Sequence, residues 1–333
     1  MPVSTQIKLA ARPTGLPKES DFRFEETTLA DPIEGQVLLK TTYLSVDPYM
    51  RGRITGVKSY ADPVLPGDVM VGGATGEVVA SKFPGLAVGD AVVGYWGWQN
   101  HAVVSGASLQ KLNPQMAPVS TALGILGMPG MTAYFGFLEL CQPKAGETVV
   151  VSGAAGAVGS AVGQIAKIKG CRVVGIAGGD DKVEYITKEL GFDAGFNYKT
   201  TTDYRGKLAE LCRNGIDCYF DNVGGAIGDA AFASMNLFGR ISICGQISQY
   251  NLEQPELGPR ILGMVLAKQL RVEGFIVTRF GPRFPEGLQQ MSQWVKEGKI
   301  KYNEQIVEGL NNTPKAFIEM LSGKNLGKML VKA

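Results

Sequence analysis

Residues 153–159 form a glycine-rich turn, Gly-Ala-Ala-Gly-Ala-Val-Gly, whose backbone could hold a phosphate group. An apolar run at residues 148–152 leads into this turn and a segment of helical periodicity follows it, which is the setting of a dinucleotide-binding turn. Gly156 would let the backbone approach a pyrophosphate, and Gly159 would let the helix pack against the strand. N–H groups for the anion would come from the first helical residues, Ala157 and Val158. We therefore predict a dinucleotide site, and the alternative is a tight structural turn.

The residues beyond the next strand decide which dinucleotide fits. An NAD site would carry an acidic residue about 20 residues beyond the turn, where it binds the ribose hydroxyls. Here the strand at residues 172–177 ends in Gly178, and no carboxylate stands at its tip. Lys182, in the first turn of the following helix, and Tyr198, at the end of the third strand, could face a 2′-phosphate instead. This pattern favours NADPH, and the alternative is that Lys182 is an ordinary solvated helix lysine.

Short apolar strands alternate with helical segments after about residue 145, which predicts an α/β fold with a parallel, doubly wound Rossmann sheet. We interpret Asp180 and Asp181 as helix N-cap residues rather than ribose ligands. The strand candidates are residues 148–152, 172–177, 194–198, 217–222, 240–244 and 270–277. The helix candidates are residues 158–169, 181–190, 203–212 and 227–237.

The first part of the chain has a different pattern, with β-branched and aromatic residues between Gly, Pro and Asp breakers at residues 35–46, 69–80 and 89–104. This pattern predicts a mostly β unit. The last segment has a strand at Ile306 and Val307, a helix opened by Thr313 and Pro314, and a strand at residues 328–331, and it could return to the first unit. We expect one domain from residues 1–125 and 300–333 and another from residues 126–299.

The composition narrows the class of partner. With 33 basic and 31 acidic side chains the net charge is only +2, so no strong field exists to attract nucleic acid or an anionic membrane. A small-molecule partner is therefore expected. The N-terminal residues lack the apolar run of a signal peptide, and the uncharged stretch at residues 112–138 is interrupted by Pro and Gly, as in a buried junction. We expect a cytoplasmic protein.

Histidine and cysteine are too scarce and too scattered for a metal site. His101 is the one histidine, and it is expected to have a structural or surface role. The cysteines show neither zinc-ligand spacing nor a secreted disulfide pattern, and we interpret all five as reduced core thiols: Cys141, Cys171, Cys212, Cys218 and Cys244.

Several phrases together resemble one family over essentially the whole chain. Besides the glycine-rich turn and Lys182, they are Asp-Pro-Tyr-Met-Arg-Gly at 47–52, Gly-Met-Pro-Gly-Met-Thr-Ala-Tyr at 127–134, Asp-Asn-Val-Gly-Gly at 221–225 and Gly-Lys-Asn-Leu-Gly-Lys at 323–328. The chain resembles the zinc-independent, NADPH-dependent alkenal and enone reductases of the medium-chain dehydrogenase/reductase superfamily, the group that includes prostaglandin reductases and curcumin reductases. The resemblance implies a GroES-like catalytic domain, a Rossmann domain and a homodimer. The Gly-His-Glu phrase that carries a zinc ligand in the superfamily's alcohol dehydrogenases is represented here by residues 73–77, without histidine.

The same resemblance implies further cofactor contacts along the nucleotide. The residues that resemble the family's positions around adenosine, ribose and nicotinamide are Asn222, Cys244, Gly245, Tyr250, Phe275, Ile276, Val277 and Asn325. Within the stretch 242–250 the chain has Gln246, where relatives often carry a smaller residue, so the shape of the pocket is an open point.

Family membership implies reduction of the C=C bond of α,β-unsaturated aldehydes and ketones by hydride transfer to the β-carbon. The protein would then contribute orientation and a hydrogen-bond donor for the developing oxyanion. Our hypothesis is that Tyr250 is this donor and that Tyr49 shapes the acceptor pocket, and the alternative is that Tyr250 only packs on its loop. A quinone oxidoreductase and an NADPH-binding protein without catalysis are the rival functions. Arg51 fits either a phosphate or interdomain ion-pair role or a structural one.

Overall fold

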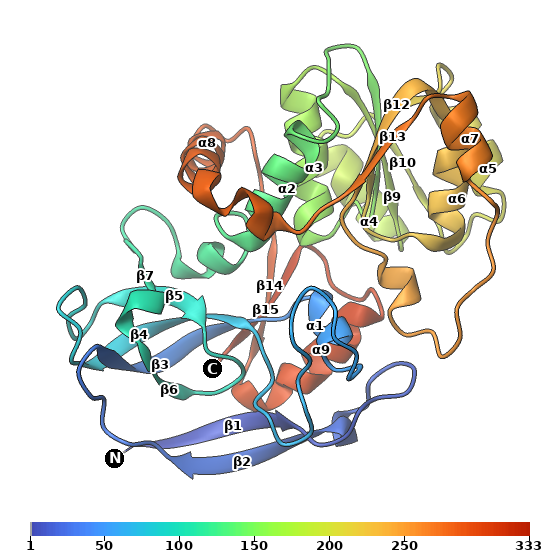
Figure 1. The fold of residues 1–333 in the computed structure, drawn as a ribbon. Helices are drawn as coiled ribbons and strands as arrows, with labels where there is room; N and C mark the ends of the chain where they lie inside the picture. The colour runs from blue at the N-terminus through green and yellow to red at the C-terminus, as the bar shows by residue number, and fades with distance from the viewer. Residues whose placement is uncertain (1) are drawn as a thin grey trace. The chain divides into compact units, whose positions relative to one another are not determined.

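Residues 2–333 are described by the computed structural model, and they divide into two units that each contain their own sheet (Figure 1). The β unit comprises residues 2–124, Glu304–Asn325 and Met329–Ala333. The α/β unit comprises Ile125–Asn303 and Leu326–Lys328. The C-terminal segment therefore contributes three residues to the α/β unit before it continues in the β unit.

The α/β unit is built on six parallel strands in the order β10-β9-β8-β11-β12-β13. Counted from β8, this is the strand order 3-2-1-4-5-6 of a Rossmann fold, in which the direction of winding changes between β8 and β11. All residues of β8 are buried, because helices cover both faces of the sheet. The strands are β8 (Thr148–Ser152), β9 (Arg172–Ala177), β10 (Ala194–Asn197), β11 (Ile216–Asp221), β12 (Met235–Ile243) and β13 (Arg271–Gly274).

Alternate residues of the sheet face two hydrophobic layers. Val149 and Val151 pack in the layer formed with α2, α3 and α8, and Val150 packs in the layer formed with α5, α6 and α7 (Figure 1). The helices are α2 (Met128–Leu138), α3 (Ala157–Ile168), α4 (Asp180–Glu184), α5 (Tyr204–Leu211), α6 (Gly225–Ala233), α7 (Leu262–Ala267) and α8 (Phe284–Lys296). Among residues 2–333, no helix combines the length and the apolar character needed to cross a membrane.

The β unit contains a seven-stranded sheet in the order β14-β15-β3-β4-β5-β7, with β6 paired to β3, and a separate antiparallel pair of β1 and β2. Its strands are β1 (Val3–Leu9), β2 (Phe22–Thr28), β3 (Gln36–Ser45), β4 (Gly73–Ser81), β5 (Ala91–Tyr95), β6 (His101–Ser105), β7 (Gln110–Lys111), β14 (Glu304–Glu308) and β15 (Lys328–Lys332). Two helices accompany them, α1 (Tyr49–Arg53) and α9 (Thr313–Leu321). The last strand, β15, pairs with β3 and so returns the C-terminal segment to the first sheet.

The β-rich segment 89–104 contains two strands, β5 and β6, and between them Gly97 adopts φ +76° and Trp98 turns into the core with no exposed surface. Several predicted boundaries of helices and strands in the α/β unit are wrong. The helix expected at 227–237 ends at Ala233, and the chain enters β12 at Met235. The strand expected at 270–277 is only β13, because residues 277–283 form a 3-10 helix. The helix expected at 181–190 changes to a π-helix at Tyr185.

Candidate nucleotide-binding site

The glycine-rich turn brings the start of α3 against the end of β8. A Cβ atom on Gly159 would lie 2.3 Å from the Gly153 carbonyl oxygen, so only glycine allows this close approach. Gly153 itself adopts φ +61°, and Gly156 is the N-cap of α3 in extended conformation. The first N–H groups of a helix have no intrahelical acceptor, so those at Ala157 and Val158 can bind an anion. The residues present therefore fit a pyrophosphate.

A short return of the chain lies beside this turn. The Gly327 N–H donates to the Ala155 carbonyl oxygen at 2.8 Å, and Gly327 forms a parallel bridge with Gly156. Gly327 adopts φ +69°, and a Cβ atom on it would lie 2.1 Å from the Asn303 carbonyl oxygen. The Gly-Lys-Asn-Leu-Gly-Lys phrase thus contains a glycine that its positive φ and the close approach of Asn303 require.

The tip of β9 is shaped by small residues and an aromatic ring. A Cβ atom on Gly178 would lie 2.7 Å from Tyr198 Oη, so the phenol of Tyr198 lies directly on this glycine. The side chain of Lys182 follows the same tip, because a Cβ atom on Gly179 would lie 3.8 Å from Lys182 Cγ. The structure thus brings Gly178, Lys182 and Tyr198 together at the end of the strand where a 2′-phosphate is expected.

Burial sets the electrostatics of this end of the site. Partial burial lowers the pKa of Lys182, the neighbouring Lys199 lowers it further, and Asp181 opposes the shift. A partly desolvated ammonium gains more from an incoming anion than a fully hydrated one does. Burial also raises the pKa of the Tyr198 phenol, which therefore remains a hydrogen-bond donor.

The assignment of Asp180 and Asp181 as N-cap residues is wrong. Gly179 is the N-cap of α4, and both acidic residues lie in its first turn without a capping hydrogen bond. Asp180 accepts a hydrogen bond from Asn197 Nδ2 at 2.9 Å. A Cβ atom on Gly179 would lie 2.4 Å from Asp181 Oδ1, so the Asp181 carboxylate lies beside this glycine.

The opposite end of the site is formed by the loops after β11 and β12. Asn222 donates from Nδ2 to the Ser152 carbonyl oxygen at 2.8 Å, so it joins the ends of β11 and β8. The N–H groups of Cys244 and Gly245 donate to the Asp221 carbonyl oxygen at 2.8 and 3.1 Å. Burial raises the pKa of the Cys244 thiol to about 12, so this cysteine is not a thiolate nucleophile.

Tyr250 folds back over the loop that precedes it. Its hydroxyl accepts a hydrogen bond from the Gln246 N–H at 3.1 Å, and a Cβ atom on Gly245 would lie 3.0 Å from the same oxygen. A phenol can accept one hydrogen bond and donate another, so this contact is compatible with donation to a substrate. Gln246 is mostly exposed, and its side chain lies on Gly224.

The three residues after β13 differ from one another. The Phe275 side chain is a core residue, because it packs on Gly136 of α2 and lies edge-on to Phe220 at 6.4 Å. Val277 is also buried, whereas Ile276 is 42% exposed. A cofactor contact by Phe275 would therefore involve its backbone rather than its ring.

Tyr49 and Asn325 belong to the β unit. Tyr49 begins α1, two residues after the buried Asp47. Burial raises the pKa of the Tyr49 phenol, and the negative charge of Asp47 raises it further. Tyr49 is therefore a neutral phenol at physiological pH and can serve as a hydrogen-bond donor.

The contacts of Arg51 and His101 favour structural roles. Arg51 is buried, and its Nη2 donates to the Gly15 carbonyl oxygen at 2.9 Å. His101 lies opposite Lys40 on neighbouring strands, and its buried Nδ1 has no hydrogen-bond partner among residues 2–333. Burial and the charge of Lys40 both lower the pKa of His101, so its imidazole is predominantly neutral at pH 7.

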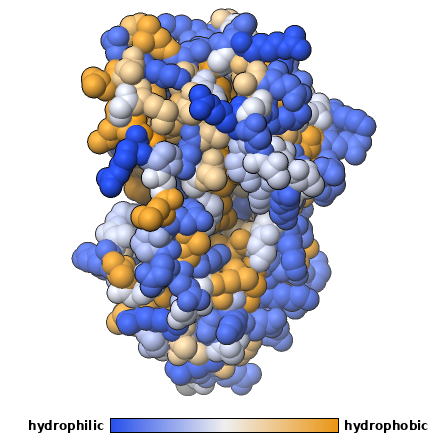
Figure 2. Space-filling view, turned by 90° about the vertical axis from the view of Figure 1, so that its right-hand side faces the viewer, coloured by the Kyte–Doolittle hydropathy of each residue, from blue (hydrophilic) through white to orange (hydrophobic). Residues whose placement is uncertain are grey.

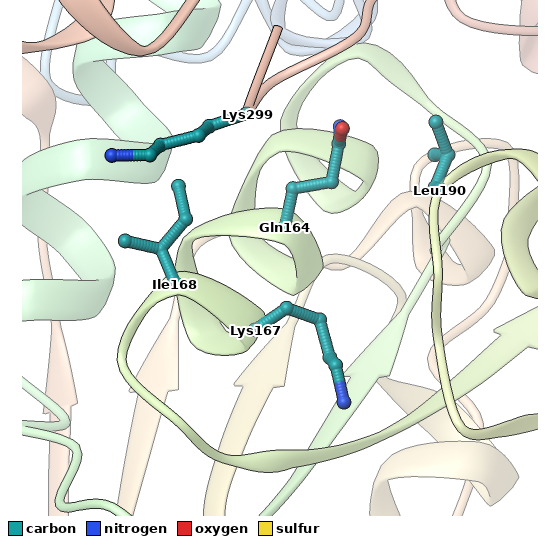
Figure 3. Close-up of a pocket in the computed structure, with 5 residues that line it drawn as sticks. All are labelled: Gln164, Lys167, Ile168, Leu190 and Lys299. Carbon is teal, nitrogen blue, oxygen red and sulfur yellow. The ribbon is translucent and has the colours of Figure 1, made fainter. Parts of the chain in front are cut away.

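A separate pocket of about 380 Å³ lies along the later turns of α3 and is lined by Gln164, Lys167, Ile168, Leu190 and Lys299 (Figure 3). The two ammonium groups point in different directions, and Lys167 pairs with Asp193 at 2.8 Å. Gln164 donates to the carbonyl oxygen of Lys301 and accepts from its N–H, both at 2.8 Å. These polar groups are used within the protein, so this pocket is a packing feature rather than a second anion site.

Two residues of the site were missed by the sequence analysis, Ser152 and Asp221. Both are buried where β8 and β11 end side by side, and the Ser152 hydroxyl donates to Asp221 Oδ1 at 2.9 Å. A polar residue that ends an otherwise apolar strand next to the glycine-rich turn was the available signal.

The fold and this site define a two-domain, dinucleotide-dependent dehydrogenase/reductase. Residues 5–112 match the family model described as the N-terminal domain of oxidoreductase, and residues 157–297 match the model described as zinc-binding dehydrogenase. The chain is 48% identical to the NADPH-dependent curcumin reductase of Escherichia coli (strain K12), over 97% of this chain and 95% of that protein. It is also 48% identical to prostaglandin reductase 1 of Rattus norvegicus, with 96% of each chain covered.

A solved structure agrees with these relatives. The crystal structure of CurA from Vibrio vulnificus in complex with NADPH has a TM-score of 0.95 and 46% identity to this chain, with 99% of each chain covered. The chain belongs to the NADPH-dependent alkenal and enone reductase family of the medium-chain dehydrogenase/reductase superfamily. The predicted fold class and family are thereby confirmed.

The residues present do not fit the zinc named in the second family description. On β4, the phrase at residues 73–77 ends in Glu77, whose side chain is exposed. In the part of the chain that the structure describes, no group of three or more His, Cys, Asp or Glu side chains could hold a metal ion. We derive no chemical step through a metal.

The first prediction concerns Lys182. Lys182→Ala should raise KM for NADPH about tenfold to a hundredfold, because a charge-assisted hydrogen bond to phosphate is worth about 1.5–3 kcal/mol. KM for NADH should hardly change, since NADH lacks the 2′-phosphate. Steady-state kinetics with both cofactors measures this, and Lys188→Ala is the matched control because Lys188 is 71% exposed and pairs with Glu184. Equal shifts for the two cofactors would refute the phosphate assignment.

Proposed function

We propose that this protein reduces the C=C bond of α,β-unsaturated aldehydes and ketones with NADPH. The observation that carries the proposal is the glycine-rich turn together with Gly178, Lys182 and Tyr198, a combination that fits the pyrophosphate and 2′-phosphate of NADPH in a chain of this family. The curcumin and prostaglandin reductases among its relatives, and the NADPH complex among the solved structures, support the same chemistry.

Bound NADPH supplies the hydride, which adds to the β-carbon of the conjugated carbonyl, and the resulting enolate takes a proton at the α-carbon to give the saturated product. The protein's own residues must orient the acceptor and stabilise the negative charge that develops on the carbonyl oxygen. We assign the donor for this oxygen to the Tyr250 hydroxyl. It is held by the Gln246 N–H and by its position over Gly245, so little reorganisation is needed as the charge develops.

We assign a second role toward the acceptor to Tyr49 of the β unit. Its raised pKa keeps the phenol neutral, so it would donate a hydrogen bond or pack against the acceptor without repelling an enolate. The reaction needs no metal in this scheme, because the cofactor transfers the hydride and hydrogen-bond donors stabilise the oxyanion.

We also propose that the protein is a homodimer, and the β13 edge of the six-stranded sheet supports this. In the described part of the chain β13 pairs only with β12, and such an edge offers unpaired backbone groups to a second strand. Leu262 and Leu266, four residues apart on α7, are 78% and 80% exposed, and Val272 of β13 is 39% exposed. Figure 2 faces the side on which α7 lies in Figure 1, and it shows apolar side chains gathered at its upper left. A second copy pairing along β13 would cover such an apolar surface.

We also place the protein in the cytoplasm. In support, all five cysteines are free, and four of them are buried; Cys244, contrary to expectation, is only partly buried. Free thiols are typical of a reducing compartment.

The second prediction tests the reaction. NADPH oxidation should be fast with α,β-unsaturated ketones or aldehydes and absent with their saturated counterparts, because only the conjugated system accepts a hydride at carbon. With NADPH deuterated at the transferred position, mass spectrometry and NMR should find deuterium on the β-carbon of the saturated product. Turnover of quinones alone would favour the quinone oxidoreductase, and NADPH binding without oxidation by any acceptor would favour the non-catalytic alternative.

The third prediction tests the oxyanion donor. Tyr250→Phe should lower kcat with an enone by about a hundredfold, the usual effect of removing one oxyanion donor. NADPH affinity, measured by fluorescence titration, should change by less than about threefold, since the ring stays in place. Tyr185→Phe is the control, because that phenol lies in the π-helical segment after α4. Equal kcat for Tyr250→Phe and the unmodified protein would leave Tyr250 with a packing role only.

The fourth prediction tests the homodimer. Leu262→Lys combined with Leu266→Lys should convert the dimer to a monomer in sedimentation experiments, because a second copy could no longer bury this face without burying charge. Leu257→Lys, at a fully exposed position in the preceding loop, is the control and should leave the dimer intact. A monomeric unmodified protein would contradict the proposal directly.

A further inference from the structure

Asp221 is a buried carboxylate at the point where the winding of the Rossmann sheet changes direction. It is the last residue of β11, and it lies next to Ser152, the last residue of β8. Its side chain is 2% exposed, and no ion pair to it is found among residues 2–333. A buried charge without a counter-ion is costly unless several hydrogen bonds stabilise it.

Four donors converge on one oxygen of this carboxylate. Oδ1 accepts hydrogen bonds from the hydroxyls of Ser152 at 2.9 Å and Tyr219 at 2.8 Å, and from the N–H groups of Val223 at 3.0 Å and Gly224 at 2.9 Å. The other oxygen faces α6, because a Cβ atom on Gly228 would lie 3.2 Å from Oδ2. Negative charge is favourable at this helix N-terminus. The carboxylate therefore fixes the path of residues 222–224.

The same residue also holds the loop after β12. Its carbonyl oxygen accepts from the N–H groups of Cys244 and Gly245 at 2.8 and 3.1 Å. Farther along, the Ser248 N–H and hydroxyl both bind the Val223 carbonyl oxygen, at 3.1 and 2.6 Å. The segment 244–250, which ends in Tyr250, is thus tied to Asp221 directly and through the 222–224 loop.

We propose that Asp221 is a positioning residue for hydride transfer, since its side chain and carbonyl oxygen together hold the two loops that present Tyr250 to the reacting end of the cofactor. The inference rests on the proposed function for the role of Tyr250. The hydrogen-bond network around Asp221 is independent of that proposal. Asp221 acts through these loops and touches neither substrate nor cofactor.

The experiment compares two isosteric substitutions on the same strand. Asp221→Asn removes the charge at the nucleotide end of β11, and Asp217→Asn removes a charge at the other end. Asp217 also binds β8, since its Oδ2 accepts from the Thr148 N–H at 2.8 Å, so both variants disturb the same pair of strands. Both proteins are assayed with NADPH and an enone, and their backbone amide hydrogen exchange is followed by mass spectrometry.

Asp221→Asn should lower kcat about tenfold to a hundredfold, because small displacements of reacting groups have effects of this size. The ratio of KM for NADPH to KM for NADH should stay within about twofold, since the Lys182 end is unaffected, and amide exchange should accelerate within residues 222–250. Asp217→Asn should retain kcat and show unchanged exchange in this segment. Unchanged kcat and exchange in Asp221→Asn, or an equal loss in Asp217→Asn, would overturn the proposal.

A second variant covers the case in which Asp221→Asn does not fold. Ser152→Ala removes one donor to the carboxylate and the hydroxyl that accepts the Asn222 N–H at 2.9 Å, without changing a buried charge. Ser152→Ala should lower kcat and accelerate amide exchange within residues 222–250, both by less than Asp221→Asn does. Unchanged kcat and exchange would count against the proposal. If the unmodified protein reduced no enone, the proposed function would fail, whereas the exchange data would still test the positioning network.

Discussion

The parallel pairing of β8 with β11 is the constraint on which the nucleotide site depends. Both strands are buried on both faces, so the polar groups at their carboxyl ends must find partners within one small region. On the β8 side the chain turns through Gly153 into α3, and on the β11 side it turns through Gly224 into α6. The two helix N-termini consequently face the same edge of the sheet, where a dinucleotide binds in this fold.

The two ends of the site depend on different physical effects. At the turn the requirement is steric, since Gly159 has room for no side chain against the Gly153 carbonyl oxygen. At the tip of β9 the requirement is both steric and electrostatic. Gly178 leaves room for the Tyr198 ring, and Lys182 supplies a positive charge; burial lowers the pKa of its ammonium group. On the proposed assignment, a cofactor that bridges both ends carries a pyrophosphate and a second anionic group, so we expect this combination to favour NADPH over NADH.

The sequence was most informative where the signal is local. β8 and β9 have the predicted bounds, because apolar runs between glycines leave little ambiguity in their ends. It was least informative where packing between distant segments decides the outcome. Phe275 is a core residue because α2 presents Gly136 to its ring, and no local pattern contains that contact. The early start of β12 likewise depends on its pairing with Ile216 of β11. Asp221 was missed for the same reason, since its partners include Ser152, which lies on another strand.

The charge on Asp221 gives direction to the hydrogen bonds around it. An anionic oxygen accepts only, so the hydroxyl and N–H groups near Oδ1 must all point toward it. The Gly224 N–H also points inward, so the carbonyl oxygen of the same trans peptide group, which is that of Val223, points away, and this oxygen accepts from Ser248. A neutral amide at this position could donate as well as accept hydrogen bonds. It would therefore no longer require all the neighbouring hydroxyl and N–H groups to point toward it. The orientation of the segment that carries Tyr250 therefore follows from a single buried charge at the end of β11.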